Sequence, residues 1–222
     1  VLGRLHEQTR YSDTTNRSYF LDHLFCLSGA SGGSVGNTSF LAAVSIQQTH
    51  PKLKSDTLST RYLDNDFLSY SLARLLGPDI IKPVFGFLPG WRDRAAALEI
   101  AMDNPSEKDS YMGQMVSGDF ATLIPNDQNM LPALCINTTK VNDGGPGVVS
   151  TINFDSSDVR ITRRKSLGST DTTYIDTSRI FGKRIDALNM VPPGHSMRIS
   201  TAMVLGARFP YMSPGGKLGD SY

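Results

Sequence analysis

A serine lies within a run of small residues, Gly29-Ala30-Ser31-Gly32-Gly33, that matches the pattern G-x-S-x-G. A serine held on a sharp turn between a strand and a helix is exposed, and flanking glycines let the backbone bend there. The N-terminus of the following helix favours a developing oxyanion, and the Gly32 N–H is the natural first donor to it. We therefore predict that Ser31 is the nucleophile of an acyl hydrolase. The glycines of its elbow are Gly29, Gly32 and Gly33. An ordinary tight turn would use the same small residues, whereas a phosphate-binding P-loop needs a Lys after the glycines.

Ser31 needs a base, and one of the four histidines of the chain is placed in the order that a Ser-Asp-His hydrolase uses. This residue is His195, in a loop before a predicted helix. The others, His6, His23 and His50, lie on a predicted helix, before the predicted nucleophile strand and in a polar turn. A loop histidine beside a helix start is more often structural. The sequence therefore favours a Ser-Asp dyad, in which a carboxylate takes the proton directly, and a Ser31–His195 pair stays the alternative.

A strand, a tight turn and a helix must position Ser31. The apolar run 20–27 predicts a buried strand, and the apolar run 40–44 predicts the buried part of a helix. A second core strand is predicted over 132–137. The segment 142–147, Asn-Asp-Gly-Gly-Pro-Gly, has the composition of a hairpin turn between two β-like runs.

Further helices are predicted by the spacing of apolar residues. The segments are 1–8, 57–102 with breaks at 77–78 and 88–90, and 196–207, whereas 104–117 is predicted to be a polar loop with a short helix. In the first of them, Val1, Leu2 and Leu5 share one face. Asp93 is placed to cap a helix over 94–102. Because strands alternate with helices, the predicted fold class is α/β.

The composition is that of an ordinary globular protein, with 39% hydrophobic and 19% charged residues among 222. We therefore predict one domain over 1–222. Lys plus Arg number 22 and Asp plus Glu 21, so the net charge of +1 gives no support to nucleic-acid binding. Cys26 and Cys135 each lie in an apolar run and are predicted to be free thiols. No stretch has the length and apolarity of a membrane span, and no signal peptide is visible.

The segment 27–34, Leu-Ser-Gly-Ala-Ser-Gly-Gly-Ser, resembles the nucleophile segment of the patatin-like phospholipase family. Two looser matches are 200–214, similar to the family's helix and Phe-Pro turn, and 134–139, similar to its central strand. The resemblance covers most of the chain, although only the elbow is specific. It implies a three-layer α/β/α domain with a central, mainly parallel sheet. It also implies a serine hydrolase of lipid esters that uses a Ser-Asp dyad and no metal or organic cofactor.

In that family an Asp-Gly-Gly or similar segment shortly after the Phe-Pro turn supplies the aspartate, and an upstream Gly-rich turn supplies further oxyanion donors. The chain has neither at those places, so we expect both to lie outside it and the domain to be incomplete at both ends. Asp143 precedes two glycines but belongs to the predicted hairpin turn. Asp220 follows the Phe-Pro turn without two glycines after it. Both stay alternatives for the aspartate.

The resemblance implies phospholipid or acylglycerol substrates and association with a membrane surface. The apolar segment 76–91 could form a lid there, although core packing explains such residues more often. The basic cluster 160–165 could hold anionic head groups, or it could be a solvated strand face. A lipid-binding domain that keeps the elbow without catalysis is a further alternative. The residues do not indicate the head group, the acyl length or the oligomeric state. They assign no localisation either; the expectation is an intracellular or membrane-peripheral protein.

Overall fold

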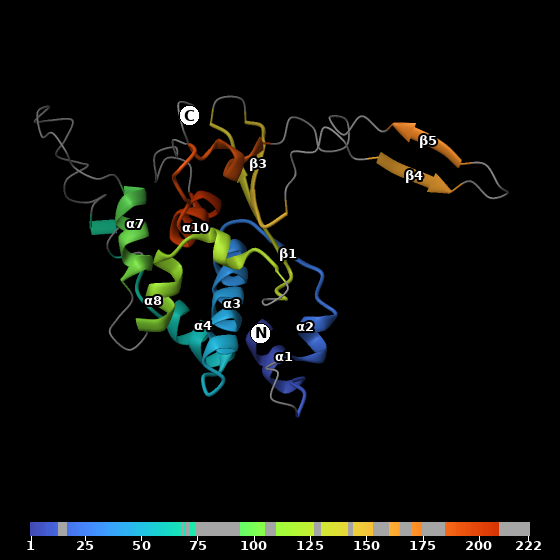
Figure 1. Cartoon of the computed structure of the whole chain (residues 1–222). Coiled ribbons are helices and arrows are strands. Elements are labelled where there is room, and N and C mark those ends of the chain that lie inside the picture. The colour runs from blue at the N-terminus through green and yellow to red at the C-terminus, as the bar shows by residue number, and fades with distance from the viewer. Residues whose placement is uncertain are drawn as a thin grey trace, which may run out of the picture.

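The described part of the chain forms a mixed α/β structure with one four-stranded sheet and one separate two-stranded sheet (Figure 1). The computed structural model describes residues 1–12, 17–67, 69, 72–73, 94–104, 110–126, 130–141, 144–152, 160–164, 170–174 and 185–208. The strands of the larger sheet are β1 (Cys26–Gly29), β2 (Ala133–Thr139), β3 (Pro146–Ser150) and β6 (Ile185–Asp186). The smaller sheet consists of β4 (Arg160–Arg164) and β5 (Thr170–Tyr174). The expected α/β class is therefore confirmed.

The larger sheet has the order β1-β2-β3-β6 and is mixed. β1 pairs in parallel with β2, with Gly29 opposite Ile136. β2 and β3 pair antiparallel, and β3 and β6 pair in parallel. Because β1 and β2 are parallel, their carboxyl ends meet at one edge of the sheet, and the segment that contains Ser31 leaves β1 at that edge.

Helices gather beside this sheet. They are α1 (Leu2–Gln8), α2 (Tyr19–Asp22), α3 (Gly32–Thr49), α4 (Ser55–Leu63), α7 (Arg94–Asp103), α8 (Ser110–Ser117) and α10 (Ile199–Ala207), with the 3-10 turns η2 (Phe120–Leu123) and η3 (Ala187–Met190). In Figure 1, α3 runs down the centre, with β1 and β3 to its right and α4, α7, α8 and α10 to its left. Both α3 and α10 pack on β2 and on each other. They therefore form one helical layer on the sheet.

The hydrophobic core lies between this helical layer and one face of the sheet. Leu27, Leu134 and Ile136 join the core cluster from β1 and β2. Side chains alternate along a strand, so the chain neighbours of these three residues point to the opposite face of the sheet. Those residues include Cys26, Ser28, Cys135 and Asn137: the two sulfur atoms lie 3.8 Å apart, and the Asn137 amide contacts the Ser28 hydroxyl. Full burial of a Leu or Ile side chain stabilises the fold by about 1.5–3 kcal/mol. The face of the sheet that carries Leu27, Leu134 and Ile136 therefore holds the sheet against the helices.

The segment before Ser31 differs from the prediction of one strand over 20–27. The chain forms the short helix α2 first, and β1 begins only at Cys26. The Ser18 hydroxyl accepts a hydrogen bond from the Leu21 N–H at 3.0 Å and so caps this helix. Phe25, counted as part of the buried run, is 83% exposed. The predicted strand is therefore wrong over 20–25; only its last two residues belong to β1, which continues two residues further to Gly29.

The first helix is confirmed at Leu2–Gln8, but the predicted apolar face is wrong. Val1 and Leu5 are exposed, whereas His6 is completely buried. The His6 ring bonds to Ser18 at 2.7 Å through Nδ1 and to Gln47 of α3 at 3.0 Å through Nε2. A polar side chain can occupy the inner face because each of its ring nitrogens has a hydrogen-bond partner.

Other predicted elements are confirmed with shifted bounds. β2 begins at Ala133, the hairpin joins β2 to β3 with Gly144 at φ +67°, and the last helix begins at Ile199. The region 57–102 holds parts of α4 and α7. Both cysteines are free thiols, as predicted. The whole of the segment 76–91 lies outside the described residues, as do Asp93, Asp143, Lys165 and Asp220.

Candidate active site

Ser31 occupies the turn between β1 and α3, at the carboxyl end of the strand as predicted. Its backbone has φ 52° and ψ −132°, and no other non-glycine residue in the described part of the chain has a positive φ. A non-glycine residue in such a conformation costs of order 1–3 kcal/mol and persists only where the surroundings hold it in place. Ser31 is exposed, so a reagent can reach its hydroxyl. These are the features that a nucleophile elbow requires.

The amide of Gly32 is available as an oxyanion donor. Gly32 is the first residue of α3, and its N–H makes no hydrogen bond within the described residues. The free N–H groups and the dipole at a helix N-terminus stabilise negative charge. An anionic oxygen that develops beside Ser31 would therefore meet a preorganised donor.

The three glycines of the elbow have different roles. A methyl group at Gly29 would lie 2.8 Å from both Gly33 C and Ser34 N, which are backbone atoms of α3. Glycine at this position therefore lets β1 approach the helix closely. A methyl group at Gly32 or Gly33 would meet nothing within 4 Å. These two residues therefore face open space among the described residues.

Two hydrogen bonds fix the helix side of the elbow. The Ser31 N–H donates to the Gly206 carbonyl at 2.8 Å, which ties the turn to the C-terminal end of α10. The buried Ser34 hydroxyl donates to the Ser31 carbonyl at 2.7 Å. Gly206 itself is closely packed, because a methyl group there would lie 2.5 Å from Ile136 Cγ2 and 2.7 Å from Ser34 Oγ. The turn is thus held between α3, α10 and β2.

The histidines lie away from Ser31. His195 precedes α10, whereas Ser31 contacts Gly206 near the other end of that helix, about 10.5 Å along the axis from Ile199 at 1.5 Å per residue. His50 caps the C-terminal end of α3, and His23 precedes the amino end of β1. His6 bonds to Gln47, about 22 Å along α3 from Gly32. The predicted alternative of a Ser31–His195 pair therefore has no support from this geometry.

The Ser31 hydroxyl makes no hydrogen bond within the described part of the chain. Cys26 is not a candidate nucleophile, because burial and the neighbouring Cys135 raise the pKa of its thiol to about 11. Cys26 therefore stays protonated at neutral pH. Among the described residues, no three His, Cys, Asp or Glu side chains gather as a possible metal site.

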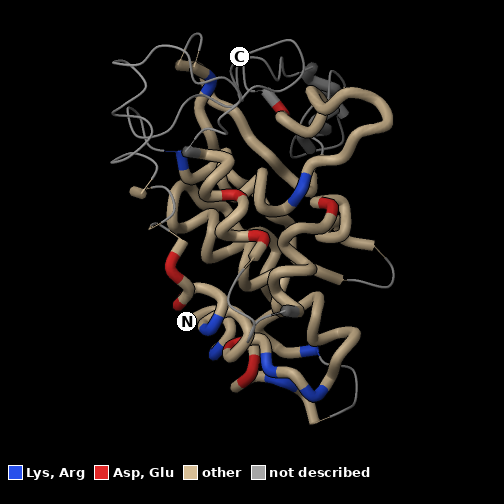
Figure 2. The backbone as a smooth tube through the Cα atoms, turned by 90° about the vertical axis from the view of Figure 1, so that its left-hand side faces the viewer, with Lys and Arg blue, Asp and Glu red and all other residues tan. Residues whose placement is uncertain are grey.

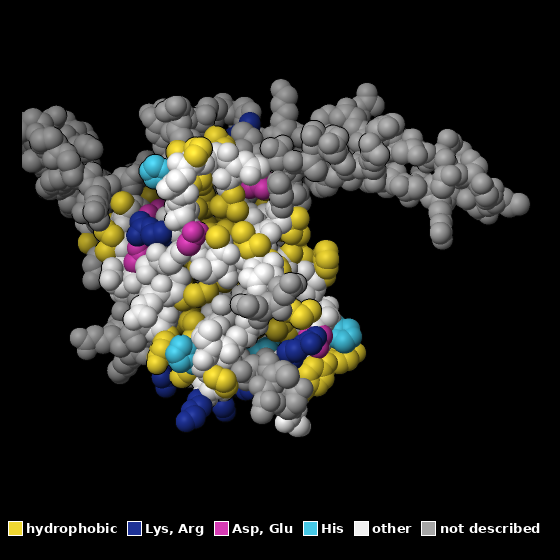
Figure 3. Space-filling model, viewed as in Figure 1, with side chains coloured by type: hydrophobic (Ala, Val, Ile, Leu, Met, Phe, Trp, Pro, Cys, Tyr) yellow, Lys and Arg dark blue, Asp and Glu magenta, His cyan; other side chains and the backbone are white. Residues whose placement is uncertain are grey.

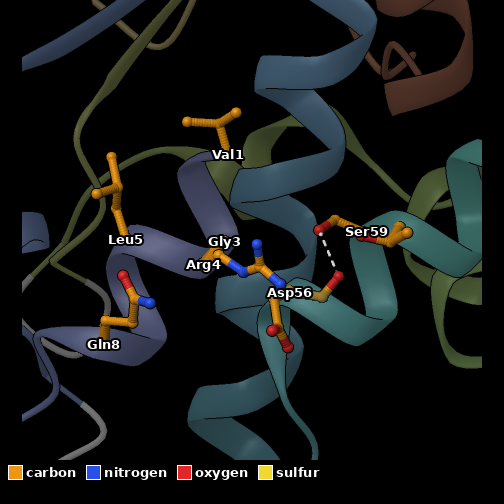
Figure 4. A pocket seen from close by; sticks show the side chains of 8 residues that line it. Val1, Gly3, Arg4, Leu5, Gln8, Asp56 and Ser59 are labelled. Atoms are coloured by element: carbon orange, nitrogen blue, oxygen red, sulfur yellow. Dashed lines mark hydrogen bonds between the residues drawn. The ribbon is translucent and has the colours of Figure 1, made fainter.

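A hollow of about 380 Å³ lies between α1 and α4 (Figure 4). Its lining includes Gly3, Arg4, Asp56 and Ser59. Because α1 contacts the C-terminal half of α3 through Gln47, this hollow is remote from the elbow at the other end of that helix. It is therefore not the space in which a substrate would meet Ser31.

Charges are interspersed over the described surface. In Figure 2, acidic and basic residues both occur along the described backbone, with several basic residues in the lower part of the view, where the N-terminus lies. On the face in Figure 3, the charged side chains that are coloured lie in small scattered groups. No helix of the described residues is both long and apolar enough to pass through a bilayer.

The sequence did not single out two residues that hold the elbow, Gly206 and Asn137. The Asn137 side chain donates from Nδ2 to the Gly29 carbonyl at 3.1 Å and to Ser28 Oγ at 2.9 Å. The feature of the sequence that could have indicated Asn137 is its place as a polar residue near the carboxyl end of a predicted core strand. Comparisons with protein families, with curated proteins and with solved structures returned no match.

Proposed function

We propose that this chain carries the nucleophile of a serine acyl hydrolase that cleaves lipid esters. The observation that supports this most strongly is the backbone of Ser31, a positive φ at an exposed strand-to-helix turn. A serine in an ordinary turn needs no such conformation. The Gly32 N–H beside it, which has no hydrogen-bond partner among the described residues, adds the donor that acyl transfer needs.

The proposed reaction passes through an acyl-enzyme. Ser31 Oγ gives its proton to a base and attacks the ester carbonyl carbon, while the Gly32 N–H binds the resulting oxyanion. The tetrahedral intermediate collapses, and the leaving alcohol takes the proton back from the base. Water then attacks the acyl-serine by the same route and releases the fatty acid.

The proposed base is a carboxylate, because the four histidines lie away from Ser31. The resemblance to the patatin-like phospholipases implies an aspartate after the helix and Phe-Pro turn. The Ser31–Gly206 hydrogen bond supports this order, since it brings the C-terminal end of α10 beside the nucleophile. Asp143 and Asp220 are the alternatives within the chain. The lipid substrate and the three-layer α/β/α fold rest on the same resemblance.

Labelling with a fluorophosphonate ester tests the nucleophile. The probe is applied to the gene product that contains these residues and to the 222 residues alone. We expect covalent labelling of the gene product that disappears in Ser31→Ala. Ser28→Ala is the matched control, because Ser28 is also an exposed serine of the same segment, and it should keep its labelling.

The outcomes separate the alternatives. A silent 222-residue chain beside a labelled gene product would indicate that the base lies outside these residues. Loss of labelling in Asp143→Asn or Asp220→Asn would place it within them. If the gene product does not react under conditions that label other serine hydrolases, the proposal is wrong. A lipid-binding domain would then be the better explanation.

A further inference from the structure

Asn137 connects β2 to the last two residues of β1. In the parallel register, Gly29 lies opposite Ile136, so Asn137 is one residue further along β2. Its Nδ2 donates to the Gly29 carbonyl at 3.1 Å and to Ser28 Oγ at 2.9 Å. The orientation of the amide follows from its partner, because a carbonyl oxygen can only accept.

The contact lies on the strand side of the strained turn. On the helix side, Ser31 is held by the Gly206 carbonyl and by the Ser34 hydroxyl. Only Ala30 separates Gly29 from Ser31, so the plane of the peptide after Gly29 sets the direction in which the chain enters the turn. A positive φ at a serine needs restraint from both sides, because the free chain relaxes to negative φ.

We propose that Asn137 is a positioning residue, which fixes the peptide plane after Gly29 and thereby holds Ser31 in its nucleophilic conformation. The catalytic part of this inference rests on the proposed function. The conformational part does not. Asn137 does not touch the position of the reacting atoms, so it acts through the backbone of the elbow.

If Asn137 had only a structural role, its replacement would change only the stability of the sheet. Thr151 provides a comparison for such a role. Thr151 Oγ1 accepts from the Leu134 N–H at 2.9 Å, near the amino end of β2 and away from the elbow. Thr151→Val removes a hydrogen bond to the same strand. The loss of a partner for a backbone group is thus matched, while the elbow is left intact.

The experiment compares Asn137→Ala, the isosteric Asn137→Asp and Thr151→Val, each characterised by urea unfolding. The first readout is amide hydrogen exchange of Ser31 and Ser34, whose N–H groups are bonded to Gly206 O and Ser31 O. The second is the rate of fluorophosphonate labelling, with kcat and KM for a soluble nitrophenyl ester where turnover occurs. Ser28→Ala removes one of the two acceptors of the Asn137 amide and leaves the Gly29 carbonyl in place. This variant should keep the exchange and labelling rates of the unchanged chain.

In both Asn137 variants we expect exchange at Ser31 and Ser34 to accelerate at least about tenfold, beyond the change in global stability. We expect labelling and kcat to fall at least about tenfold with KM unchanged, because small misplacements of a reacting group cost this much or more. Thr151→Val should show neither effect. Local exchange that changes only as much in the Asn137 variants as in Thr151→Val would overturn the inference. If the unchanged gene product never labels, the proposed function fails, and the exchange measurement still decides the role of Asn137.

Discussion

Replacement of Gly29 by alanine tests whether β1 approaches α3 as closely as the structure describes. The new methyl group would lie 2.8 Å from Gly33 C and 2.8 Å from Ser34 N. Both are backbone atoms in the first turn of α3, so neither can move away by a change of rotamer. The strand or the helix must shift.

The expected loss of stability follows from this contact. Overpacking in a well-packed interior costs about 1–3 kcal/mol, and a clash with backbone belongs at the upper end, about 3 kcal/mol. In a protein of this size each kcal/mol shifts Tm by about 2–4 °C, so Gly29→Ala should lower Tm by about 6–12 °C. Labelling of Ser31 should fall as well, because the shift displaces the elbow.

Gly33→Ala is the matched control. A methyl group there would meet nothing within 4 Å, and alanine is favoured over glycine within a helix by roughly 0.5–1 kcal/mol. This variant should therefore raise Tm by about 1–4 °C. Thermal unfolding followed by circular dichroism measures both changes. A Gly29→Ala variant as stable as the unchanged protein would refute the close approach of strand and helix.

Three further predictions concern residues away from the elbow. Burial lowers the pKa of His6, so its neutral form is favoured in the folded protein and its contribution to stability is present above its ordinary pKa of about 6.5. Stability should therefore fall as the pH drops from 7.5 to 5, and urea midpoints should show a smaller fall in His6→Gln. Tyr62→Phe removes a buried hydrogen bond of 3.1 Å to the Met102 carbonyl and should lower the free energy of unfolding by about 1–2 kcal/mol, measured in urea. His195→Ala should keep its rate of fluorophosphonate labelling, because His195 lies at the remote end of α10.

Each of these has a result that would contradict it. An equal fall of the urea midpoint in His6→Gln would assign the pH dependence to other groups, of which Glu7 and Arg10 are the charged neighbours of His6. An unchanged Tyr62→Phe variant would mean that the hydroxyl bond contributes nothing net. Complete loss of labelling in His195→Ala, with the fold intact, would restore the Ser31–His195 pair.

The sequence alone determined the features whose causes are local. The small residues between two apolar runs predicted the turn that carries Ser31, and the Asn-Asp-Gly-Gly segment predicted the hairpin between β2 and β3. These features depend on backbone preferences of a few consecutive residues, which act wherever the segment lies. The same kind of reasoning gave a wrong prediction at 20–27. The apolar run indicated a strand, but Ser18 caps a short helix, α2, at the start of this run.

Only the tertiary structure decided which side chains are buried and what restrains the backbone of Ser31. His6 is inside and Leu5 outside because Gln47, 41 residues away, supplies the partner for an imidazole. Ser31 keeps its positive φ because Gly206 and Asn137, far along the chain, hold the turn from both sides. Such contacts depend on how the sheet and helices pack together. No window of neighbouring residues contains that information.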